Sequence, residues 1–417
     1  MKNSRPLKLL KRIFKHNLPY YRYLQRKRIE RIRQKGYANV VFTVGNLPMW
    51  RAQGLYDLLR SDPRFRLYIL LLEFTTQTKE ENERNFDILR AYFKQRDIPC
   101  FTLDELPPHI QLDHWDPDII FYVQPYTKLY PKSVRYTTYK DRLTAYIPYG
   151  LMTVFRKWNY NKGLHNTAWR VYLPTEIHRE NARYFSDCEA ENVRVVGEPH
   201  ADDFLRKETK KVWKGDGLKK RIIWAPHFRI NPSKMFYRPS FLWTHKIMLE
   251  IADYYKDSIQ FAFKPHPRLY SELCKHPDWG PEKAKAYYEL WATMPNTQLE
   301  TGEFVDLFKE SDALIHDCGS FVAEYMFTKK PCMFLTHDSE SVSAEMCRFG
   351  KECFSLHHLG QSKEDILRFI EDIVIAGHDN KLSEREEFFS QHLLPPNGNT
   401  TAMNMYLDIT QTLFGEE

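Results

Sequence analysis

The sequence predicts an α/β protein with two Rossmann-like domains that face each other across a cleft, preceded by a basic helical arm. Short apolar runs of strand length alternate with helix-like segments along most of the chain. This alternation stops at a charged, glycine-containing stretch, residues 206–220, and then restarts. Strands that alternate with helices are typical of parallel sheets covered by helices. We therefore expect an arm at 1–36, an N-terminal domain at 37–205, a C-terminal domain at 206–395 and a closing helix at 396–417.

The overall composition excludes several classes of protein. With 417 residues, of which 42% are hydrophobic and 15% aromatic, the chain can form two packed cores. No apolar stretch approaches the roughly 18 residues of a membrane-spanning helix, and the first 35 residues lack the apolar region of a signal peptide. The seven cysteines are scattered without a CxxC pair. They predict free thiols in a cytoplasmic protein, and neither a disulfide framework nor a zinc site.

The first 36 residues carry most of the positive charge. They hold thirteen Lys and Arg against one acid, Glu30, so their formal charge is +12, whereas the whole chain is +7 and the remaining residues carry −5. Leu7, Leu10, Ile13 and Phe14 recur among the cations at helical spacing. A basic amphipathic helix of this kind can lie on an anionic membrane surface. The alternatives are a solvated helix packed on its own domain, or a nucleic-acid partner; the rest of the chain has no nucleic-acid motif and the wrong sign of charge for the latter.

In the first domain, apolar runs bounded by turn residues predict strands. The run at 39–44 is closed by Gly45-Asn46, and the run at 118–123 follows the turn Asp116-Pro117. Longer segments predict helices at 50–59 and 79–96. The complete set of predicted strands is 39–44, 66–74, 99–103, 118–123, 143–147, 171–173 and 193–196.

The second domain repeats the pattern. We expect its strands at 221–224, 259–263, 313–315 and 332–335. Two segments, 270–274 and 281–294, flank a charged loop. Helices are predicted at 241–255, 304–309, 321–328, 362–377 and 400–414. In open parallel sheets, ligands bind at the carboxyl ends of the strands, so the residues that follow each strand are the first candidates for function.

One stretch, residues 311–325, carries the clearest functional pattern. An apolar run ends there in a turn of small and polar residues that opens into a helix-like segment. Gly319 and Ser320 allow backbone N–H groups to point at an anion, which the positive end of a helix dipole favours. Glu324, one turn into the helix, can accept hydrogen bonds from ribose hydroxyls. The pattern predicts a nucleotide diphosphate site; the alternative is a plain strand–helix junction with Asp317 as the N-cap.

Two other strands of the second domain end in hydrogen-bond donors. His227 and Arg229 follow the first, and His266 and Arg268 follow the second. An arginine can grip phosphate oxygens with two hydrogen bonds, and His266 can hydrogen-bond the leaving phosphate or give it a proton. A lone histidine beside prolines is more often structural, but three such strand ends at one sheet edge favour a site.

These residues define the predicted site. Arg229 and His266 are the predicted catalytic residues. The predicted donor-binding residues are His227, Arg268, Asp317, Gly319, Ser320 and Glu324. No metal-ligand cluster is evident in the sequence, so neither a metal nor a cofactor is expected, and the arginines and the helix dipole could replace a metal.

The order and spacing of these segments resemble the CDP-glycerol glycerophosphotransferase family of teichoic-acid-type polymerases and primases. The resemblance is good over residues 195–340 and faint over 37–195. The segments that carry it are Gly197-Glu198-Pro199-His200-Ala201-Asp202, Ala225-Pro226-His227-Phe228-Arg229, Lys264-Pro265-His266-Pro267, His316-Asp317-Cys318-Gly319-Ser320 and Lys330-Pro331-Cys332-Met333-Phe334. The resemblance implies a GT-B fold with the nucleotide donor in the C-terminal domain and the acceptor in the N-terminal one. It also implies peripheral attachment to the inner face of the membrane, which suits the basic arm.

The chain departs from this family at one position. The family usually carries a Trp-His-Gly-Thr segment whose histidine is proposed as catalytic, and the nearest match here is Ile147-Pro148-Tyr149-Gly150, which places Tyr149 at the histidine position. A free tyrosine, with a pKa near 10, is a poor base at neutral pH. Either another residue, such as His165 or His266, takes the role, or the chemistry differs.

The function predicted from the sequence is the transfer of a polyol phosphate from a CDP-activated donor to a hydroxyl of a cell-surface glycan or a lipid-linked precursor. The acceptor oxygen would attack the β-phosphorus and CMP would leave. The predicted partners are this donor, the glycan or lipid-linked acceptor and an anionic membrane surface bound through residues 1–36, with no nucleic acid. Two alternatives stay open: an inverting GT-B glycosyltransferase that uses a nucleotide sugar, and a non-catalytic GT-B scaffold.

Overall fold

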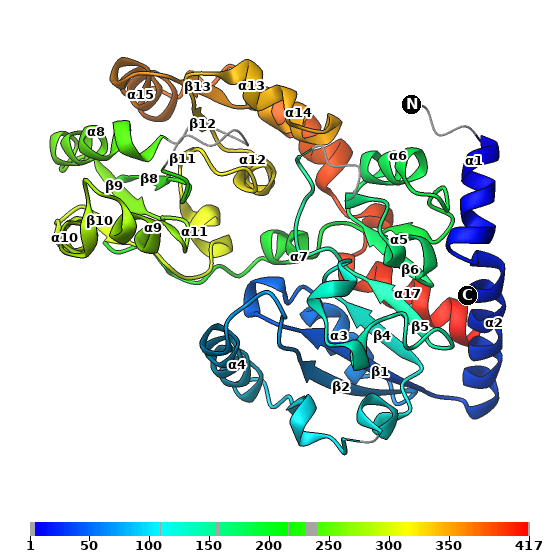
Figure 1. Ribbon diagram of the computed structural model, residues 1–417. Coiled ribbons are helices and arrows are strands. Elements are labelled where there is room, and N and C mark those ends of the chain that lie inside the picture. The colour runs from blue at the N-terminus through cyan, green and yellow to red at the C-terminus, as the bar shows by residue number, and fades with distance from the viewer. Residues whose placement is uncertain (1–4, 109, 155–158, 216, 231–239, 416–417) are drawn as a thin grey trace. The chain divides into compact units, whose positions relative to one another are not determined.

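The computed structural model describes residues 5–108, 110–154, 159–215, 217–230 and 240–415, with side chains described from residue 8 onward (Figure 1). Leu7 of the predicted apolar face therefore lies outside the described side chains. The chain forms two compact units. The first comprises Met1–Gly150, Arg156–Asp202 and Leu394–Glu417, and the second comprises Leu151–Phe155 and Asp203–Leu393.

The first unit is built on a seven-stranded sheet in which every paired strand is parallel, in the order β3-β2-β1-β4-β5-β6-β7. The interior strand β1 is buried along its whole length, as expected for a strand covered on both faces. The order reverses between β1 and β4. The strands are β1 (Ala38–Val44), β2 (Phe65–Leu71), β3 (Cys100–Thr102), β4 (Ile119–Tyr122), β5 (Leu143–Tyr146), β6 (Arg170–Leu173) and β7 (Val193–Val195).

Helices cover this sheet, and the last helix of the chain is one of them. α17 (Thr401–Phe414) begins where the Asp202 carboxylate accepts hydrogen bonds from the backbone N–H groups of Thr401 and Ala402, at 2.7 and 2.9 Å. It packs closely on α3, where a Cβ added at Gly54 would lie 2.9 Å from that of Ala402. The other helices are α2 (Leu18–Lys35), α3 (Gln53–Arg60), α4 (Lys79–Lys94), α5 (Gly163–Thr167), α6 (Glu176–Phe185) and α7 (Pro199–Leu205).

The basic arm forms α1 (Arg5–Leu10), a π-helix (Lys11–Lys15) and α2, and it packs on the first unit through ion pairs. The carboxylate of the fully buried Asp187 lies within ion-pair distance of Lys11, Lys15 and His16. Arg12 and Arg22 form ion pairs with Glu191. Farther along α2, Arg28 and Lys35 bind the buried Asp118. Much of the arm's positive charge is therefore neutralised by acids of its own unit.

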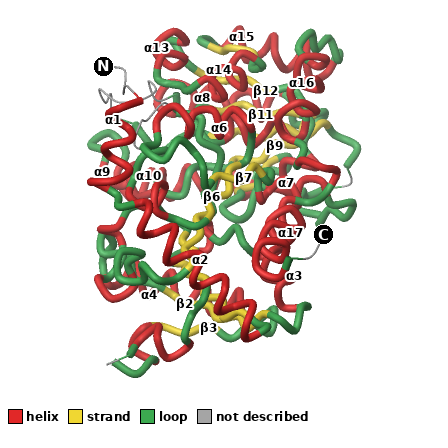
Figure 2. Tube along the Cα trace, turned by 90° about the vertical axis from the view of Figure 1, so that its right-hand side faces the viewer, coloured by secondary structure: helices red, strands yellow, loops and turns green. Residues whose placement is uncertain are grey.

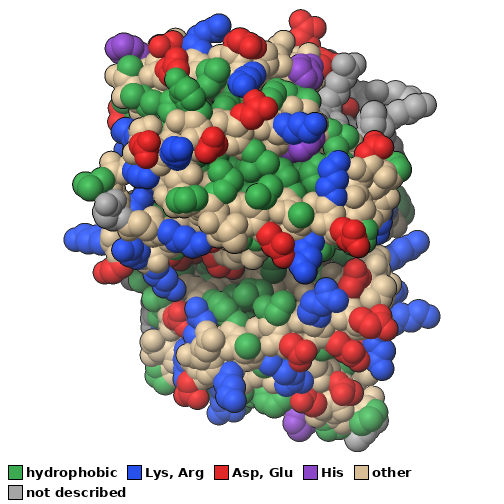
Figure 3. Space-filling view, turned by 90° about the vertical axis from the view of Figure 1, so that its left-hand side faces the viewer, with side chains coloured by type: hydrophobic (Ala, Val, Ile, Leu, Met, Phe, Trp, Pro, Cys, Tyr) green, Lys and Arg blue, Asp and Glu red, His purple; other side chains and the backbone are tan. Residues whose placement is uncertain are grey.

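The arm nevertheless exposes apolar side chains. Leu9, Leu10, Ile13 and Phe14 are exposed, with Phe14 at 80% of its full area. These four residues are called the arm's apolar face below. On the face of the molecule drawn in Figure 3, by contrast, acidic and basic side chains are interspersed among apolar ones.

The second unit contains a six-stranded parallel sheet in the order β10-β9-β8-β11-β12-β13, which reverses between β8 and β11. Its core is aromatic: the Trp224 ring lies 4.9 Å from Phe263 and 5.3 Å from Trp291. The two parallel sheets, with helices around the strands (Figure 2), confirm the predicted fold class. The strands are β8 (Lys220–Ala225), β9 (Ile259–Phe263), β10 (Thr297–Leu299), β11 (Ala313–His316), β12 (Cys332–Leu335) and β13 (His358–Gly360).

Two helices of the second unit differ from the prediction. The predicted helix at 321–328 is a four-residue α-helix, α12 (Phe321–Glu324), continued by a 3₁₀-helix, Tyr325–Thr328. The buried Tyr325 hydroxyl lies 2.8 Å from Ser311 Oγ and fixes this second turn. The segment 362–377 is α15 (Lys363–Arg368) followed by a π-helix, Phe369–Ile375. The remaining helices are α8 (Phe241–Tyr254), α9 (Leu269–Lys275), α10 (Gly280–Thr293), α11 (Val305–Glu310), α13 (Ser339–Ala344), α14 (Arg348–Ser355) and α16 (Leu382–Phe388).

A short segment from the first half of the sequence belongs to the second unit. Val154 forms an antiparallel bridge with Met346, and the Thr153 carbonyl accepts a hydrogen bond of 3.0 Å from the Cys347 backbone. Gly350 in α14 makes room for this contact, because a Cβ there would lie 2.0 Å from the Thr153 carbonyl oxygen. Thr153 Oγ1 also donates to the carbonyl of Gly319, at 3.1 Å.

Candidate functional site

The site lies at the point where the strand order of the second sheet reverses. Parallel strands on the two sides of such a reversal leave a crevice at their carboxyl ends. β8 ends before His227, its neighbour β9 ends before Lys264 and His266, and β11 ends before Asp317. The carboxyl ends of β8, β9 and β11 therefore lie at one edge of the second sheet, as the sequence analysis expects for the residues that follow them.

Hydrogen bonds from the backbone set the tautomer of both histidines. His227 Nδ1 accepts the N–H of Arg229 at 3.3 Å, and His266 Nδ1 accepts the N–H of Arg268 at 3.1 Å. With Nδ1 acting as the acceptor, the proton of each neutral imidazole is on Nε2. The two rings lie 5.1 Å apart. The site thus presents two Nε2–H donors, which is what a pair of phosphate groups can accept.

Both imidazoles are neutral at physiological pH. Burial, with smaller contributions from the charges of His266, Arg229 and Arg268, lowers the pKa of His227 to about 3. Burial and the charge of Arg268 lower the pKa of His266 to about 4. Partly desolvated, positively charged surroundings disfavour imidazolium and favour an incoming anion.

The two arginines flank an aromatic ring that the sequence analysis did not single out. The Arg268 guanidinium lies 4.2 Å from the centre of the Phe228 ring, and that of Arg229 lies 5.9 Å from it. The His266 ring is 4.5 Å from the same ring. Phe228 is therefore the hydrophobic support against which both cations and His266 are held.

Asp317 does not cap α12, which corrects the capping interpretation. Its side chain is buried and accepts the backbone N–H of His227 at 2.6 Å and that of Ser240 at 2.9 Å. Burial raises its pKa, although both of these hydrogen bonds oppose the rise. The N-cap position of α12 is Ser320, which makes no side-chain cap. Asp317 instead ties the end of β11 to the segment that follows β8.

Two buried histidines support the residue that precedes the turn at Gly319–Ser320. His357 Nδ1 lies 2.9 Å from the Cys353 carbonyl and must donate to it, which leaves His357 Nε2 as an acceptor. His316 Nε2, at 3.1 Å, is then the donor, and His316 Nδ1 accepts the Cys318 N–H at 3.2 Å. Burial lowers the pKa of His357 to about 3 and that of His316 well below its usual range. This neutral chain fixes Cys318 and leaves Ser320 exposed.

Glu324 is more buried than we expect for a side chain that contacts a ribose at the surface. It is 6% exposed, and its charge is among those that oppose the lowering of the Lys264 pKa by burial. Lys264 Nζ donates to the Gly302 carbonyl at 2.6 Å. Because α12 has only four residues, the contribution of a helix dipole is small, and the charged side chains are the stronger candidates for binding an anion.

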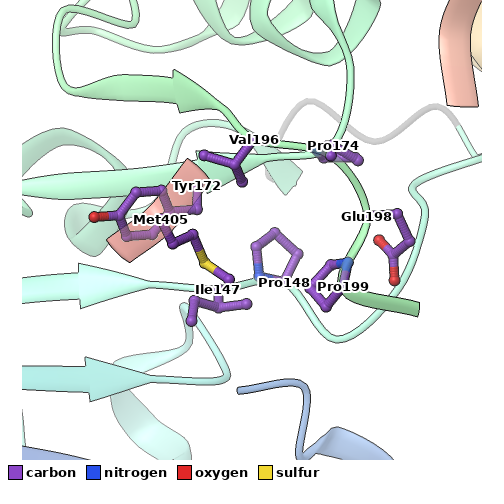
Figure 4. A pocket seen from close by; sticks show the side chains of 9 residues that line it. Ile147, Pro148, Tyr172, Pro174, Val196, Glu198, Pro199 and Met405 are labelled. Carbon is purple, nitrogen blue, oxygen red and sulfur yellow. The ribbon is translucent and has the colours of Figure 1, made fainter. Parts of the chain in front are cut away.

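The first unit holds the candidates for the acceptor side. His165 is buried, its Nδ1 accepts the Lys162 N–H at 2.9 Å, and burial lowers its pKa to about 3, which makes it a weak base. Tyr149 is 44% exposed, and its carbonyl accepts a hydrogen bond from Arg51 Nε at 2.8 Å. A small pocket opens at the carboxyl ends of β5, β6 and β7 (Figure 4).

Two features are absent from the part of the chain that the structure describes. Within them, no three His, Cys, Asp or Glu side chains come together as a metal site. Among the helices formed by the same residues, none combines the length and the apolar character needed to cross a membrane.

The chain matches the model of a known family. The model of the CDP-glycerol:poly(glycerophosphate) glycerophosphotransferase family matches residues 168–387, which is more than half of the chain. The matched region contains every residue of the predicted site. A comparison with curated protein sequences finds no match.

Solved structures share the fold at low sequence identity. The wall teichoic acid polymerase TagF is 12% identical with a TM-score of 0.59, and the match covers 100% of this chain and 99% of that one. A putative UDP-N-acetylglucosamine 2-epimerase from Listeria monocytogenes is 15% identical with a TM-score of 0.57, covering 91% and 98%. The S. aureus protein MnaA, solved with UDP, is 14% identical with a TM-score of 0.56, also covering 91% and 98%.

Proposed function

Because the chain belongs to the CDP-glycerol:poly(glycerophosphate) glycerophosphotransferase family, we propose that its second unit holds the diphosphate of a CDP-activated donor at the ends of β8, β9 and β11. The family makes the protein a transferase that moves a polyol phosphate from a CDP-linked donor to an acceptor hydroxyl. One observation carries the proposed site: at the reversal of strand order, two neutral Nε2–H donors, two arginines and the turn with the exposed Ser320 follow strands that end at one sheet edge.

The proposed roles follow from this geometry. Arg229 and His266 stabilise the charge that shifts onto the leaving CMP phosphate as the acceptor oxygen attacks the β-phosphorus. His227, Arg268, the backbone of Gly319 and Ser320 and the Ser320 hydroxyl hold the remaining diphosphate oxygens. Asp317 acts indirectly, by fixing the backbone of His227. That Glu324 holds the ribose stays a prediction.

The acceptor is proposed to be a hydroxyl of a cell-surface polymer or of its lipid-linked precursor. The family description names poly(glycerophosphate), and TagF, which shares the fold, is a wall teichoic acid polymerase. Of the solved structures that share the fold, one is named a UDP-N-acetylglucosamine 2-epimerase and another was solved with UDP. A uridine-nucleotide donor is therefore the alternative that an experiment must separate.

Thermal-shift measurements with CDP, CMP, CDP-glycerol, CDP-ribitol, UDP and UDP-sugars test the donor site. A ligand at 100 times its Kd stabilises by about 2.7 kcal/mol, which raises the melting temperature by several degrees. We expect this shift with cytidine nucleotides, and its loss in Arg229→Ala and Ser320→Ala. Arg368→Ala, at an exposed arginine of the same unit, is the matched control.

The two alternatives, a nucleotide-sugar donor and a non-catalytic scaffold, predict different changes in melting temperature. Stabilisation by uridine nucleotides alone would replace the polyol-phosphate donor by a nucleotide sugar. No shift with any of these nucleotides in the intact protein would leave a non-catalytic scaffold and contradict the proposed site.

We also propose that the arm's apolar face attaches the protein to the inner face of the membrane. Four apolar side chains are exposed there, beside cations that already pair with Asp187, Glu189 and Glu191. Because those acids reduce the arm's electrostatic attraction to anionic lipid, apolar insertion carries a large share of the affinity.

Co-sedimentation with vesicles containing anionic phospholipid tests the attachment. The double variant Leu10→Ser with Phe14→Ser should lose most of the binding, whereas Leu218→Ser, at an 88% exposed leucine elsewhere, should keep it. Binding that is unchanged in the double variant, or that disappears entirely at moderate salt, would contradict attachment through this face.

A further inference from the structure

We propose that Thr153 is a positioning residue of the donor site. Its hydroxyl holds the peptide between Gly319 and Ser320 in the orientation that presents the Ser320 N–H to the diphosphate. The proposal rests on the proposed function, because it concerns the turn that we propose binds the donor. Thr153 lies outside the part of the chain that the family model matches, which begins at residue 168.

Thr153 is itself held on both sides by the second unit. Its carbonyl accepts the Cys347 N–H at 3.0 Å, and the carbonyl of the preceding Met152 accepts a hydrogen bond from Cys347 Sγ, also at 3.0 Å. The following Val154 forms the antiparallel bridge with Met346. Thr153 is 4% exposed. Its side chain therefore meets the turn from a fixed and buried position.

The hydroxyl of Thr153 acts on one peptide unit of the turn. Thr153 Oγ1 donates to the Gly319 carbonyl at 3.1 Å. That carbonyl belongs to the same planar unit as the Ser320 N–H, and in a trans peptide the C=O and the N–H point in opposite directions. A hydrogen bond that fixes the carbonyl toward the buried Thr153 therefore directs the N–H away from it. Because Ser320 is exposed, this is the open side of the turn.

The peptide after Gly319 needs such a support. Glycine has no Cβ, so the peptide beside it can rotate at little steric cost. The Ser320 side chain makes no capping hydrogen bond, and the Ser320 carbonyl accepts the N–H groups of Ala323 and Glu324 inside α12. A rotation of the 319–320 peptide by half a turn would replace the N–H by a carbonyl oxygen, which repels phosphate.

The support from His316 acts on a different peptide. His316 Nδ1 accepts the Cys318 N–H at 3.2 Å, which fixes the residue before Gly319. This bond does not involve the peptide between Gly319 and Ser320. The two supports therefore do not replace each other, and removal of the Thr153 hydroxyl leaves the 319–320 peptide without its side-chain partner.

Calorimetric measurement of CDP binding tests this role. Thr153→Val keeps the branched shape and removes the hydroxyl, so we expect the Kd for CDP to rise by at least about fivefold, the factor that corresponds to one ordinary hydrogen bond. Thr153→Ser keeps the hydroxyl and should bind CDP within about twofold of wild type. Thr153→Ala removes the hydroxyl without crowding the site and should bind as weakly as Thr153→Val.

Thr297→Val is the matched control. Thr297 is also buried in the second unit, and its hydroxyl donates to the Trp291 carbonyl at 2.7 Å. It begins β10, whereas the donor site lies at the carboxyl ends of the strands. Thr297→Val and Thr153→Val each leave one buried carbonyl without a hydroxyl donor, so both should melt below wild type. Only Thr153→Val should bind CDP more weakly.

Amide hydrogen exchange at saturating CDP gives a second measurement. The proteolytic fragment that contains Ser320 should be protected by CDP in wild type and in Thr153→Ser, and less protected in Thr153→Val. Three results would each overturn the proposal: a Kd for Thr153→Val within twofold of wild type, a Thr153→Ser variant as weak as Thr153→Val, or an equal loss of affinity in Thr297→Val. A wild-type protein that binds no cytidine nucleotide would instead overturn the proposed function, so the two failures are distinguishable.

Discussion

At the scale of single residues, the proposed donor site holds its two histidines neutral. The N–H groups of Arg229 and Arg268 occupy the Nδ1 atoms of His227 and His266, and burial beside positive charge lowers both pKa values. The unliganded site therefore avoids concentrating four positive charges around Phe228. A diphosphate brings negative charge within hydrogen-bonding distance of both Nε2–H groups, which favours the protonated form.

Proton uptake on donor binding is the direct consequence. Because bound diphosphate raises the pKa of His227 and His266, the complex binds more protons than the free protein, and affinity increases as pH falls. CDP-glycerol suits this measurement because its phosphates are diesters that do not titrate near neutrality. Calorimetry at pH 5.5 in two buffers of different ionisation enthalpy should show uptake of up to about one proton, with a smaller uptake at pH 7.5. His266→Gln, which keeps a donor but cannot take a proton, should reduce the uptake; uptake equal to wild type would exclude His266 as its source.

At the scale of elements, the sequence predicts the buried strands better than their edges. The strand predicted at 259–263 has those bounds, and the one at 332–335 does too, because each is an apolar run in the middle of a sheet. β10 and β13 have three residues each and lie at the sheet edges. Their extended conformation depends on backbone pairing with β9 and β12. Three residues carry too little periodicity to be recognised in a sequence.

The candidate site shows the same division. The residues that follow β8, β9 and β11 are predictable because parallel topology places all strand ends at one edge. His357 and Thr153 are not, although both support the Gly319 turn. His357 lies 41 residues from His316, and Thr153 lies 166 residues from Gly319, so only tertiary packing brings them together.

Gly350→Ala tests the contact between residues 151–154 and α14. The added Cβ would lie 2.0 Å from a backbone oxygen, which cannot move as a flexible side chain would. Overpacking of this kind costs about 1–3 kcal/mol, and the melting temperature of a domain this size should fall by roughly 3–10 °C. Gly302→Ala, where nothing lies within 4 Å of the added carbon, is the control and should melt like wild type. Equal melting of the two variants would show that the 151–154 segment is not packed as described.

At the scale of the whole molecule, positive charge is concentrated in the arm, which we propose attaches to the membrane, and not in the rest of the chain. The arm has a formal charge of +12 and the remaining residues have −5, yet many of the arm's cations bind Asp118, Asp187 and Glu191. Those pairs hold the arm on the first unit and leave its apolar face exposed. The proposed membrane contact and the proposed donor site therefore belong to separate elements of the chain.

The buried histidines make the fold sensitive to acid. The pKa is lowered to about 3 for His165, His227 and His357 and to about 4 for His266 and His358, mainly by burial in each case. The unfolded chain, with histidine pKa values near 6.5, binds more protons than the folded protein between pH 6.5 and about 4. The stability from these groups is therefore complete above pH 6.5 and is lost as pH falls through that window. The raised carboxyl pKa values of Asp202 and Asp317 act in the opposite direction, but they are fewer.

We accordingly expect the melting temperature to fall steadily from pH 7 to pH 5. The fully buried His165 offers the cleanest test, because Asn at this position can place its oxygen near Nδ1 and keep the hydrogen bond from Lys162. His165→Asn removes one titrating group, so the slope of unfolding free energy against pH should decrease by up to about 1.4 kcal/mol per pH unit. Urea unfolding at several pH values measures that slope. A slope equal to that of the wild type would mean that His165 is protonated in the folded protein and that burial does not hold it neutral.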